Sequence, residues 1–72
     1  MKEFHKRMKD RGITDTILGA RSGVSAKQIN NYYTKEPPPE PRHETAVIIL
    51  AELGAETWQE LMQEISSPSV SH

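Results

Sequence analysis

The sequence of 72 residues contains no cysteine and few aromatic residues, and it has no long apolar run. Without cysteine the chain forms no disulfide, so its stability must come from helix packing or from a partner subunit. No stretch approaches the roughly 18 apolar residues that a membrane-spanning helix needs. The charged N-terminus is followed by no apolar segment, which excludes a signal peptide. We therefore expect a single small domain in a soluble, cytoplasmic protein.

The patterns of a catalytic or metal site are absent as well. His5, His43 and His72 do not have the spacing of metal ligands. The sequence has no glycine-rich loop for phosphate, and neither a group of serine, histidine and acid nor a pair of carboxylates in a catalytic pattern. We expect no enzymatic activity, no cofactor or metal, and no small-molecule ligand.

The formal net charge of −1 hides two halves of opposite sign. Residues 1–36 contain eight lysines or arginines and four acids, a balance of +4, whereas residues 37–72 contain one arginine and six glutamates, a balance of −5. A polyanion responds to the local field rather than to the total charge, so the first half can face phosphate groups. The alternative is a solvated surface on which charges cluster by chance.

Helical periodicity, capping residues and glycine stops predict a compact all-α bundle of five short helices. The predicted helices are residues 2–11, 15–22, 26–33, 42–53 and 57–65. The segment "TKEPPPEP" interrupts this pattern and is expected to be an extended, stiff connector. Residues 1–65 would form one domain and residues 66–72 a disordered tail, because the tail has nothing to bury.

The third helix has the strongest start signal in the sequence. Ser25 and Gln28 match the S-x-x-Q capping box, in which each side chain bonds the backbone N–H of the other residue. Gly23 ends the preceding helix and leaves room only for a tight turn before Ser25. Two short helices joined in this way form a helix-turn-helix.

A helical wheel divides the third helix into two faces. Ile29 and Tyr32 point to the core, together with Val24 from the turn. A polar stripe covers the opposite face, formed by Lys27, Asn30, Asn31 and Thr34. Asparagine is a poor helix former, so a purely solvated face would more often contain glutamate and lysine. Asparagine can bind adenine through two hydrogen bonds in the major groove, which makes this stripe a candidate DNA-reading surface.

The last two helices offer a surface for pairing. The apolar stripe of the fifth helix comprises Trp58, Leu61, Met62 and Ile65, and Ile48 points away from the core face of the fourth helix. We expect these five residues to form the interface of a twofold homodimer, in which tryptophan is a typical anchor. In the alternative, Trp58 completes the core of the monomer.

The stretch "DTILGARSGVSAKQINNYY" resembles the helix-turn-helix of lambda-repressor-like and Cro-like (Xre-type) regulators. Gly19 takes the small-residue position of that pattern and Gly23 its turn glycine; the apolar positions are matched by Leu18, Val24, Ile29 and Tyr32. The resemblance covers about residues 12–56, through "PRHETAVIILAELG". Glycine replaces the usual alanine at position 19, which should loosen the second helix by about 0.5–1 kcal/mol. The short length, the doubled tyrosine and the unusually proline-rich loop are also similar to small phage repressors associated with anti-CRISPR operons.

The resemblance implies a sequence-specific regulator of transcription that binds double-stranded DNA. It would repress an inverted-repeat operator as a homodimer, with the third helix in the major groove. The implied base-reading residues are Ala26, Lys27, Asn30 and Asn31. The implied phosphate-binding or positioning residues are Thr14, Thr16, Arg21, Ser25, Gln28, Tyr33, Thr34, Lys35 and Arg42. Gln28 ranks lower because the capping box can occupy it, and a structural role for Tyr33 is the alternative to a phosphate contact.

The rival function is a protein-interaction module of the same fold, such as an antitoxin or adaptor. Its working surface would be the acidic C-terminal helices. RNA binding is a further alternative, but the sequence lacks stacking aromatic residues on an exposed face.

Overall fold

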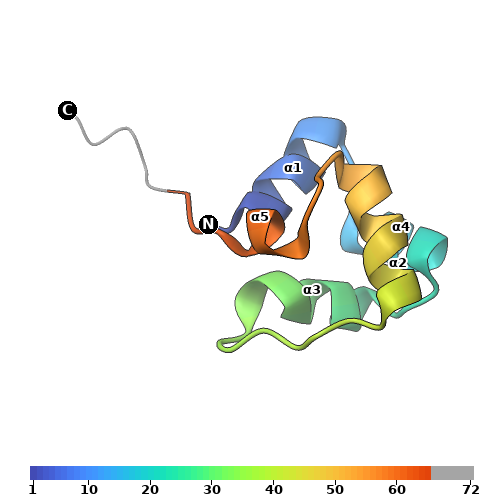
Figure 1. Cartoon of the computed structure of the whole chain (residues 1–72). Helices are drawn as coiled ribbons and strands as arrows, with labels where there is room; N and C mark the ends of the chain where they lie inside the picture. Colours follow the sequence, from blue (N-terminus) through green and yellow to red (C-terminus); the bar gives the residue numbers. More distant parts are fainter. Residues whose placement is uncertain (66–72) are drawn as a thin grey trace.

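A computed structural model describes residues 1–65 of the chain, which contain five helices (Figure 1). The helices are α1 (Glu3–Arg11), α2 (Asp15–Ser22), α3 (Ala26–Thr34), α4 (His43–Leu53) and α5 (Trp58–Met62). The only extended pairing within residues 1–65 is an isolated antiparallel bridge between Lys2 and Glu64. The predicted all-α fold is therefore confirmed, and the arrangement of α2 and α3 is compatible with a helix-turn-helix. The predicted tail, residues 66–72, lies outside the described residues.

The predicted caps determine where the helices begin. The side-chain oxygens of Thr14, Ser25 and Thr57 each accept a hydrogen bond from a backbone N–H in the first turn of α2, α3 and α5, at 3.2, 3.1 and 3.2 Å. Such bonds satisfy N–H groups that have no partner inside the helix. Gly23 ends α2 with a φ of +80°, a left-handed conformation that costs glycine little.

The fifth helix is shorter than predicted. It ends at Met62 rather than Ile65, because the following residues run extended beside the N-terminus. The backbone N–H of Glu3 donates to the carbonyl oxygen of Gln63 at 2.8 Å, and that of Ile65 donates to Met1 at 2.9 Å. The two ends of the described chain thus hold each other in place.

All five helices contribute to one apolar core. Its buried members are Phe4, Met8, Leu18, Ile29, Tyr32, Ile49, Leu53 and Leu61. The few aromatic rings gather at one place: Phe4 lies 6.1 Å from Tyr32 and 5.7 Å from Trp58, measured between ring centroids. These contacts join α1, α3 and α5, so the position of α3 is fixed by large buried groups.

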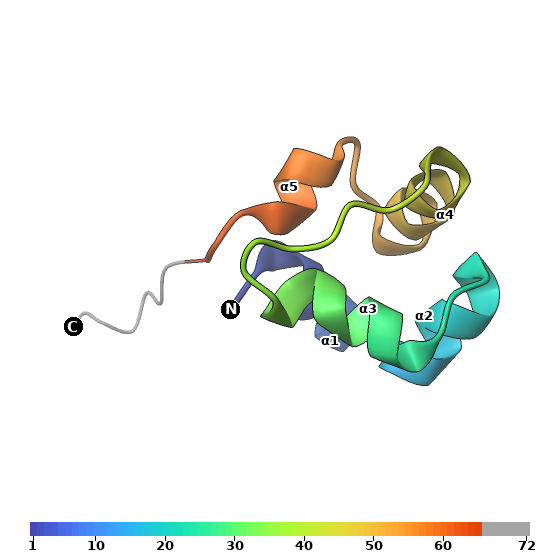
Figure 2. The same ribbon diagram turned by 90° about the horizontal axis from the view of Figure 1, so that it is seen from below.

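The arrangement leaves one side of α3 at the surface. Figure 1 shows α3 along the lower edge of the molecule, with α1 and α5 above it. The connector of residues 35–42 runs back alongside α3 to reach α4 (Figure 2). No helix within residues 1–65 is long and apolar enough to cross a membrane.

Candidate nucleic-acid interface

The two predicted faces of α3 are present. Ile29 and Tyr32 are buried, whereas Lys27 and Thr34 are exposed. The polar residues Gln28, Asn30 and Asn31 are half-buried, as is Ala26, which starts the helix. A helix with this pattern presents polar groups along one side while its other side is held by the core.

Gly19 determines how closely α2 approaches the turn before α3. A Cβ atom placed on Gly19 would lie 2.6 Å from the carbonyl oxygen of Val24 and 3.3 Å from the backbone nitrogen of Ala26. Both are backbone atoms, so relief would require a shift of the turn itself. Glycine at this position therefore has a second role beside its expected effect on α2: its missing side chain makes room for the turn that leads into α3.

One flank of α3 is tied to α2 by a hydrogen-bond network. The Tyr33 hydroxyl donates to the Asp15 carboxylate at 2.7 Å. The Asn30 side-chain nitrogen donates to the same hydroxyl at 3.1 Å and to Asp15 at 3.4 Å. The single hydrogen of the Thr34 hydroxyl is donated to the Asn30 carbonyl oxygen at 2.8 Å, and the Asn30 side-chain oxygen lies 3.3 Å from that hydroxyl as a weaker second acceptor. We call Asp15, Asn30 and Tyr33 the tied flank.

The tied flank bears on two predicted roles. The Asn30 side-chain nitrogen donates to Tyr33 and Asp15 in the free protein, so reading a base as predicted would require these bonds to break. Tyr33 takes its structural alternative, because its hydroxyl binds Asp15 and its ring stacks on His5, with 4.2 Å between centroids and 16° between planes. Burial, followed by the hydrogen bond to Asp15, raises the pKa of the Tyr33 phenol and keeps it a donor.

The other flank of α3 carries side chains without such partners. The side-chain amides of Gln28 and Asn31 make no hydrogen bond to any described residue, and Lys27 makes no ion pair there. The capping box is only half formed, because Ser25 accepts from the Gln28 backbone N–H while the Gln28 side chain does not return the bond. Gln28 is therefore not diverted into the cap. We call Lys27, Gln28 and Asn31 the open flank.

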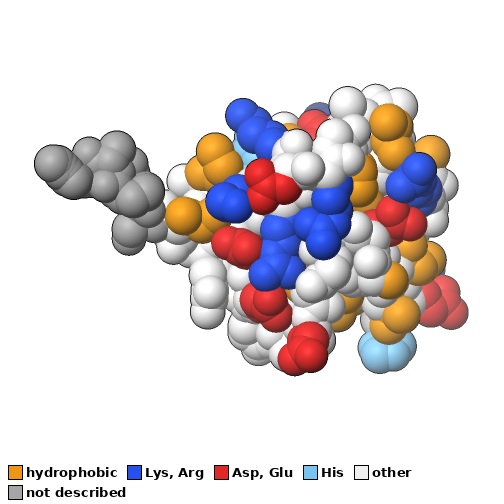
Figure 3. Space-filling view, turned by 90° about the horizontal axis from the view of Figure 1, so that it is seen from above, with side chains coloured by type: hydrophobic (Ala, Val, Ile, Leu, Met, Phe, Trp, Pro, Cys, Tyr) orange, Lys and Arg blue, Asp and Glu red, His pale blue; other side chains and the backbone are white. Residues whose placement is uncertain are grey.

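Three of the eight cations of the first half form ion pairs with the second half. Lys2, Arg7 and Arg21 pair with three glutamates of the second half, at 3.9 Å to Glu64, 2.6 Å to Glu60 and 2.8 Å to Glu52. On the face opposite α3, side chains of both signs interleave (Figure 3). Part of the charge asymmetry between the halves therefore serves to join them, and Arg21, a predicted phosphate anchor, is paired with Glu52 in the free protein.

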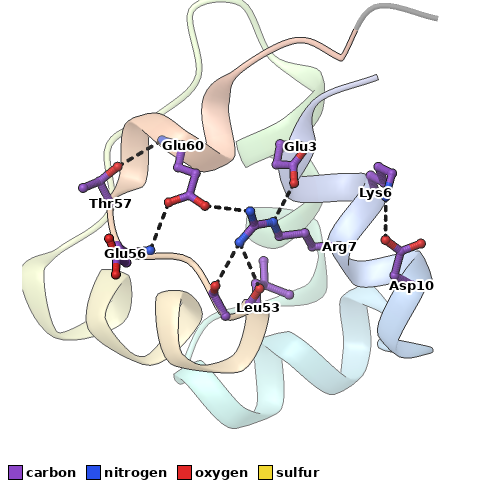
Figure 4. A network of polar contacts seen from close by, with 9 residues as sticks. Glu3, Lys6, Arg7, Asp10, Leu53, Glu56, Thr57 and Glu60 are labelled. Carbon is purple, nitrogen blue, oxygen red and sulfur yellow. Dashed lines mark hydrogen bonds and ion pairs between the residues drawn. The ribbon is translucent and has the colours of Figure 1, made fainter. Parts of the chain in front are cut away.

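Arg7 is the centre of this pairing, and the sequence analysis did not single it out. Its guanidinium donates to Glu3 at 2.7 Å and to Glu60 at 2.6 Å, and also to the carbonyl oxygen of Leu53 at 3.4 Å (Figure 4). The hydrogen bond to Glu3 is the main cause that raises the pKa of the Arg7 guanidinium. The pKa of the Glu60 carboxyl is lowered, mainly by the hydrogen bond from the backbone N–H of Glu56 and next by the bond from Arg7. The i,i+4 spacing of Glu3 and Arg7 could have predicted their ion pair from the sequence. The pair with Glu60 could not be predicted in this way, because Glu60 comes close to Arg7 only in the folded chain.

The remaining predicted phosphate contacts lie around the two ends of α3. Lys35 and Arg42 are exposed and, like the predicted base-reading residue Lys27, have no ion-pair partner among the described residues. Thr14 and Ser25 are exposed caps of α2 and α3, and Thr16 is exposed in the first turn of α2. Thr34 is exposed too, but its hydroxyl donates to the Asn30 carbonyl oxygen at 2.8 Å.

The predicted dimer residues divide between core and surface. Leu61 is fully buried, so its assignment to an interface is wrong: it completes the core of the single chain. Trp58 is half-buried against Phe4 and Tyr32, in edge contacts at 5.7 and 5.3 Å, and to that extent takes the core role that was its alternative. The remaining three residues reach the surface: Ile48 is 36% exposed, and Met62 and Ile65 are half-buried.

Comparisons with protein-family models, with curated proteins and with solved structures found no match for this chain.

Proposed function

We propose that this protein binds double-stranded DNA in a sequence-specific way, with α3 in the major groove and the open flank against the base edges. The observation that supports this most is the pair of amides of Gln28 and Asn31, which bond to no residue within 1–65, beside the Lys27 cation, which has no ion-pair partner there. Asparagine and glutamine suit the N6 and N7 atoms of adenine, and lysine suits the acceptors of guanine. In the predicted base-reading set of Ala26, Lys27, Asn30 and Asn31, Gln28 thus takes the place of Asn30.

The attachment of α3 supports the same proposal. Base reading requires side chains held in place, and α3 is fixed on one side by Tyr32 in the core and on another by the tied flank. Its N-terminus, capped by Ser25, offers backbone N–H groups and a positive dipole end that attract phosphate. Lys35 and Arg42 lie at either end of the connector and would add backbone contacts that position the protein.

We further propose that the protein acts as a repressor of transcription, bound to an inverted repeat as a homodimer in the cytoplasm. Few unpaired cations surround α3, so one chain would gain limited affinity from phosphates. Two chains on two half-sites, about one helical turn apart, would together reach the affinity typical of specific regulators. A bound dimer would then block access to the promoter by occupancy alone.

The test is selection of binding sites from random duplexes with the wild-type protein. We expect enrichment of one sequence with twofold symmetry, and loss of preference at defined positions when Gln28→Ala is used in its place. The control is Gln59→Ala, an exposed glutamine of the same size in α5. Failure of the wild-type protein to enrich any sequence would contradict the proposal.

The rival function, an interaction module with an acidic working surface, receives less support. Glu52, Glu60 and Glu64 of the second half are paired with cations of the same chain. A partner that recognised these carboxylates would have to compete with those pairs.

A further inference from the structure

A hollow lies between the start of α4 and the turn before α3. It has a volume of about 510 Å³, and its wall is largely polar, with Ser22 from the turn and Arg42, Glu44 and Thr45 from the start of α4. The Ser22 hydroxyl is already in use, because it donates to the carbonyl oxygen four residues before it at 2.7 Å. The polar groups left to receive a ligand are therefore those of α4.

The Thr45 hydroxyl is a recessed donor without a partner. Thr45 is only 7% exposed, yet its side chain makes no hydrogen bond to any described residue. In the buried and half-buried residues within 1–65, every side-chain nitrogen or oxygen that is sealed from solvent has a hydrogen-bond partner. The Thr45 hydroxyl has none, so it must still be reached from outside, and the opening that Thr45 lines is this hollow. A recessed polar group that waits for a partner points to a ligand.

The backbone at the start of α4 adds further donors. The backbone N–H groups of His43, Glu44 and Thr45 have no acceptor within residues 1–65, and no side chain caps the helix. In a helix of 11 residues, these N–H groups and the positive end of the dipole attract an anion. The exposed Arg42 lines the same hollow and has no ion-pair partner among the described residues, so its guanidinium supplies a full positive charge.

We propose that this hollow binds a phosphate group. The phosphate oxygens would accept hydrogen bonds from the Thr45 hydroxyl, from the first N–H groups of α4 and from the Arg42 guanidinium. Phosphate presents several acceptor oxygens around one centre, and arginine binds it through two parallel N–H groups. A carboxylate has only two oxygens and would leave more of these donors unused. We call Arg42, Thr45 and the first N–H groups of α4 the α4 phosphate site.

One acidic side chain lies in the same wall and opposes an anion. Glu44 is exposed and has no ion-pair partner in the described part of the chain. Water screens the charge of an exposed carboxylate, whereas it reaches the bonds of the recessed Thr45 much less. The site therefore works in spite of Glu44, and Glu44→Gln should strengthen phosphate binding by about two- to fivefold. Weaker phosphate binding by Glu44→Gln would contradict the proposed site.

The first test uses the full chain without DNA and inorganic phosphate as the probe. The titration is kept at constant ionic strength with chloride and is followed through the backbone amide NMR signals of residues 43–45. We expect saturable shifts for wild type and for Thr45→Ser, which keeps the hydroxyl. Thr45→Val should bind at least about tenfold more weakly, because a hydrogen bond to a charged group is lost. No saturable shift at residues 43–45, or equal binding by Thr45→Val, would overturn the inference.

A matched pair of arginine variants tests the charge of the site. Arg42→Gln should weaken phosphate binding by about tenfold, since it removes a charge-assisted bond. The control is Arg11→Gln, because Arg11 is an equally exposed class of side chain at the end of α1 and does not line the hollow. Its phosphate binding should equal that of wild type. An equal loss in both variants would mean that the attraction is not specific to this hollow.

The melting temperature separates ligand binding from a structural role of Thr45. Because the Thr45 hydroxyl has no partner in the empty protein, Thr45→Val should be at least as stable as wild type without phosphate. Phosphate should raise the melting temperature of wild type by mass action, but not that of Thr45→Val. A variant that melts lower without phosphate and still gains from its addition would show that the hydroxyl serves the fold.

A DNA strand and a free phosphate-bearing molecule carry the same group, and only the first source rests on the proposed function. If DNA supplies the group, phosphate should displace a selected duplex more strongly than chloride does at equal ionic strength, and Thr45→Val should bind that duplex about tenfold more weakly. If a free molecule supplies it, Thr45→Val should bind the duplex like wild type.

The two proposals fail separately. A protein that binds phosphate at residues 43–45 but selects no duplex would defeat the proposed function and leave the α4 phosphate site standing. A protein that selects a duplex but shows no phosphate shift at residues 43–45 would do the reverse.

Discussion

The two flanks of α3 present the same residue type in adjacent positions with different surroundings. Asn30, on the tied flank, donates to Tyr33 and Asp15 and accepts from Thr34. Asn31, on the open flank, makes no side-chain hydrogen bond to a described residue. One step along a helix turns a side chain by about 100°, which is enough to move it from a neighbouring helix to the surface. Both asparagines have an amide that could bind a base, but only the Asn31 amide is free of hydrogen bonds to the described residues.

The largest expected effect comes from a change that would disturb both flanks together. Gly19→Ala should destabilise the protein by about 1–3 kcal/mol, because the new Cβ would overlap the backbone before α3. Helix propensity alone predicts the opposite sign, a gain of roughly 0.5–1 kcal/mol. Urea denaturation measures the difference. Ala20→Gly on the exposed side of α2 gives the propensity effect by itself, and a stabilised Gly19→Ala would show that the turn yields easily.

The second prediction compares how much a side chain on each flank contributes to the free energy of unfolding. Asn30→Ala should leave the protein less stable than Asn31→Ala by about 0.5–1.5 kcal/mol, the typical net contribution of a hydrogen bond. Both changes gain the same helix propensity, so the gain cancels in the comparison. Thermal unfolding of the two variants checks this. Equal melting temperatures would mean that the tied flank contributes nothing to holding α3.

The third prediction concerns the charges around the open flank. If Lys35 and Arg42 are the phosphate contacts of each chain, the slope of the logarithm of affinity against the logarithm of salt concentration should be roughly −2 per chain. Lys35→Ala should reduce the magnitude of this slope by about 1. Arg21→Ala should leave it unchanged, because Arg21 is paired with Glu52. A slope that decreases equally for both variants would show that the ion pair opens on DNA.

The smallest expected effect is at high pH and involves the tied flank alone. The folded state raises the pKa of Tyr33 above its unfolded value, so the protonated phenol is favoured in the fold. The resulting stability is fully present below the unfolded pKa of about 10 and is lost as the pH rises through the folded pKa. Tyr33→Phe should therefore reduce the loss of stability in alkaline solution. An identical pH profile for Tyr33→Phe and wild type would contradict this role.

Local signals in the sequence predicted most of the helices. Thr14, Ser25 and Thr57 begin their helices as expected, because an N-cap acts within one turn and needs no tertiary contact. The end of α5 was wrong because it depends on pairing between residues 63–65 and the N-terminus. Such contacts join distant parts of the chain and leave no local pattern.

The candidate site was predicted only in part for the same reason. The helical wheel identified the outward stripe of α3, but the bonds from Asn30 and Tyr33 to Asp15 depend on how α2 crosses α3. The sequence ranks Gln28 lower because the capping box can hold its side chain, but the structure forms only the Ser25 half of that box. The pairing of Arg7 and Arg21 with distant glutamates was not predicted, because it is visible only in the fold.

The most direct measurement compares the affinities of Asn30→Ala and Asn31→Ala for one selected duplex, at fixed salt. Our account predicts that Asn31→Ala loses about 1–3 kcal/mol of binding and relaxes the preference at one base pair. Asn30→Ala should keep that preference and bind nearly as well as wild type wherever it remains folded. If Asn30→Ala loses the base preference and Asn31→Ala keeps it, the tied flank opens to read DNA and the assignment of the open flank is wrong.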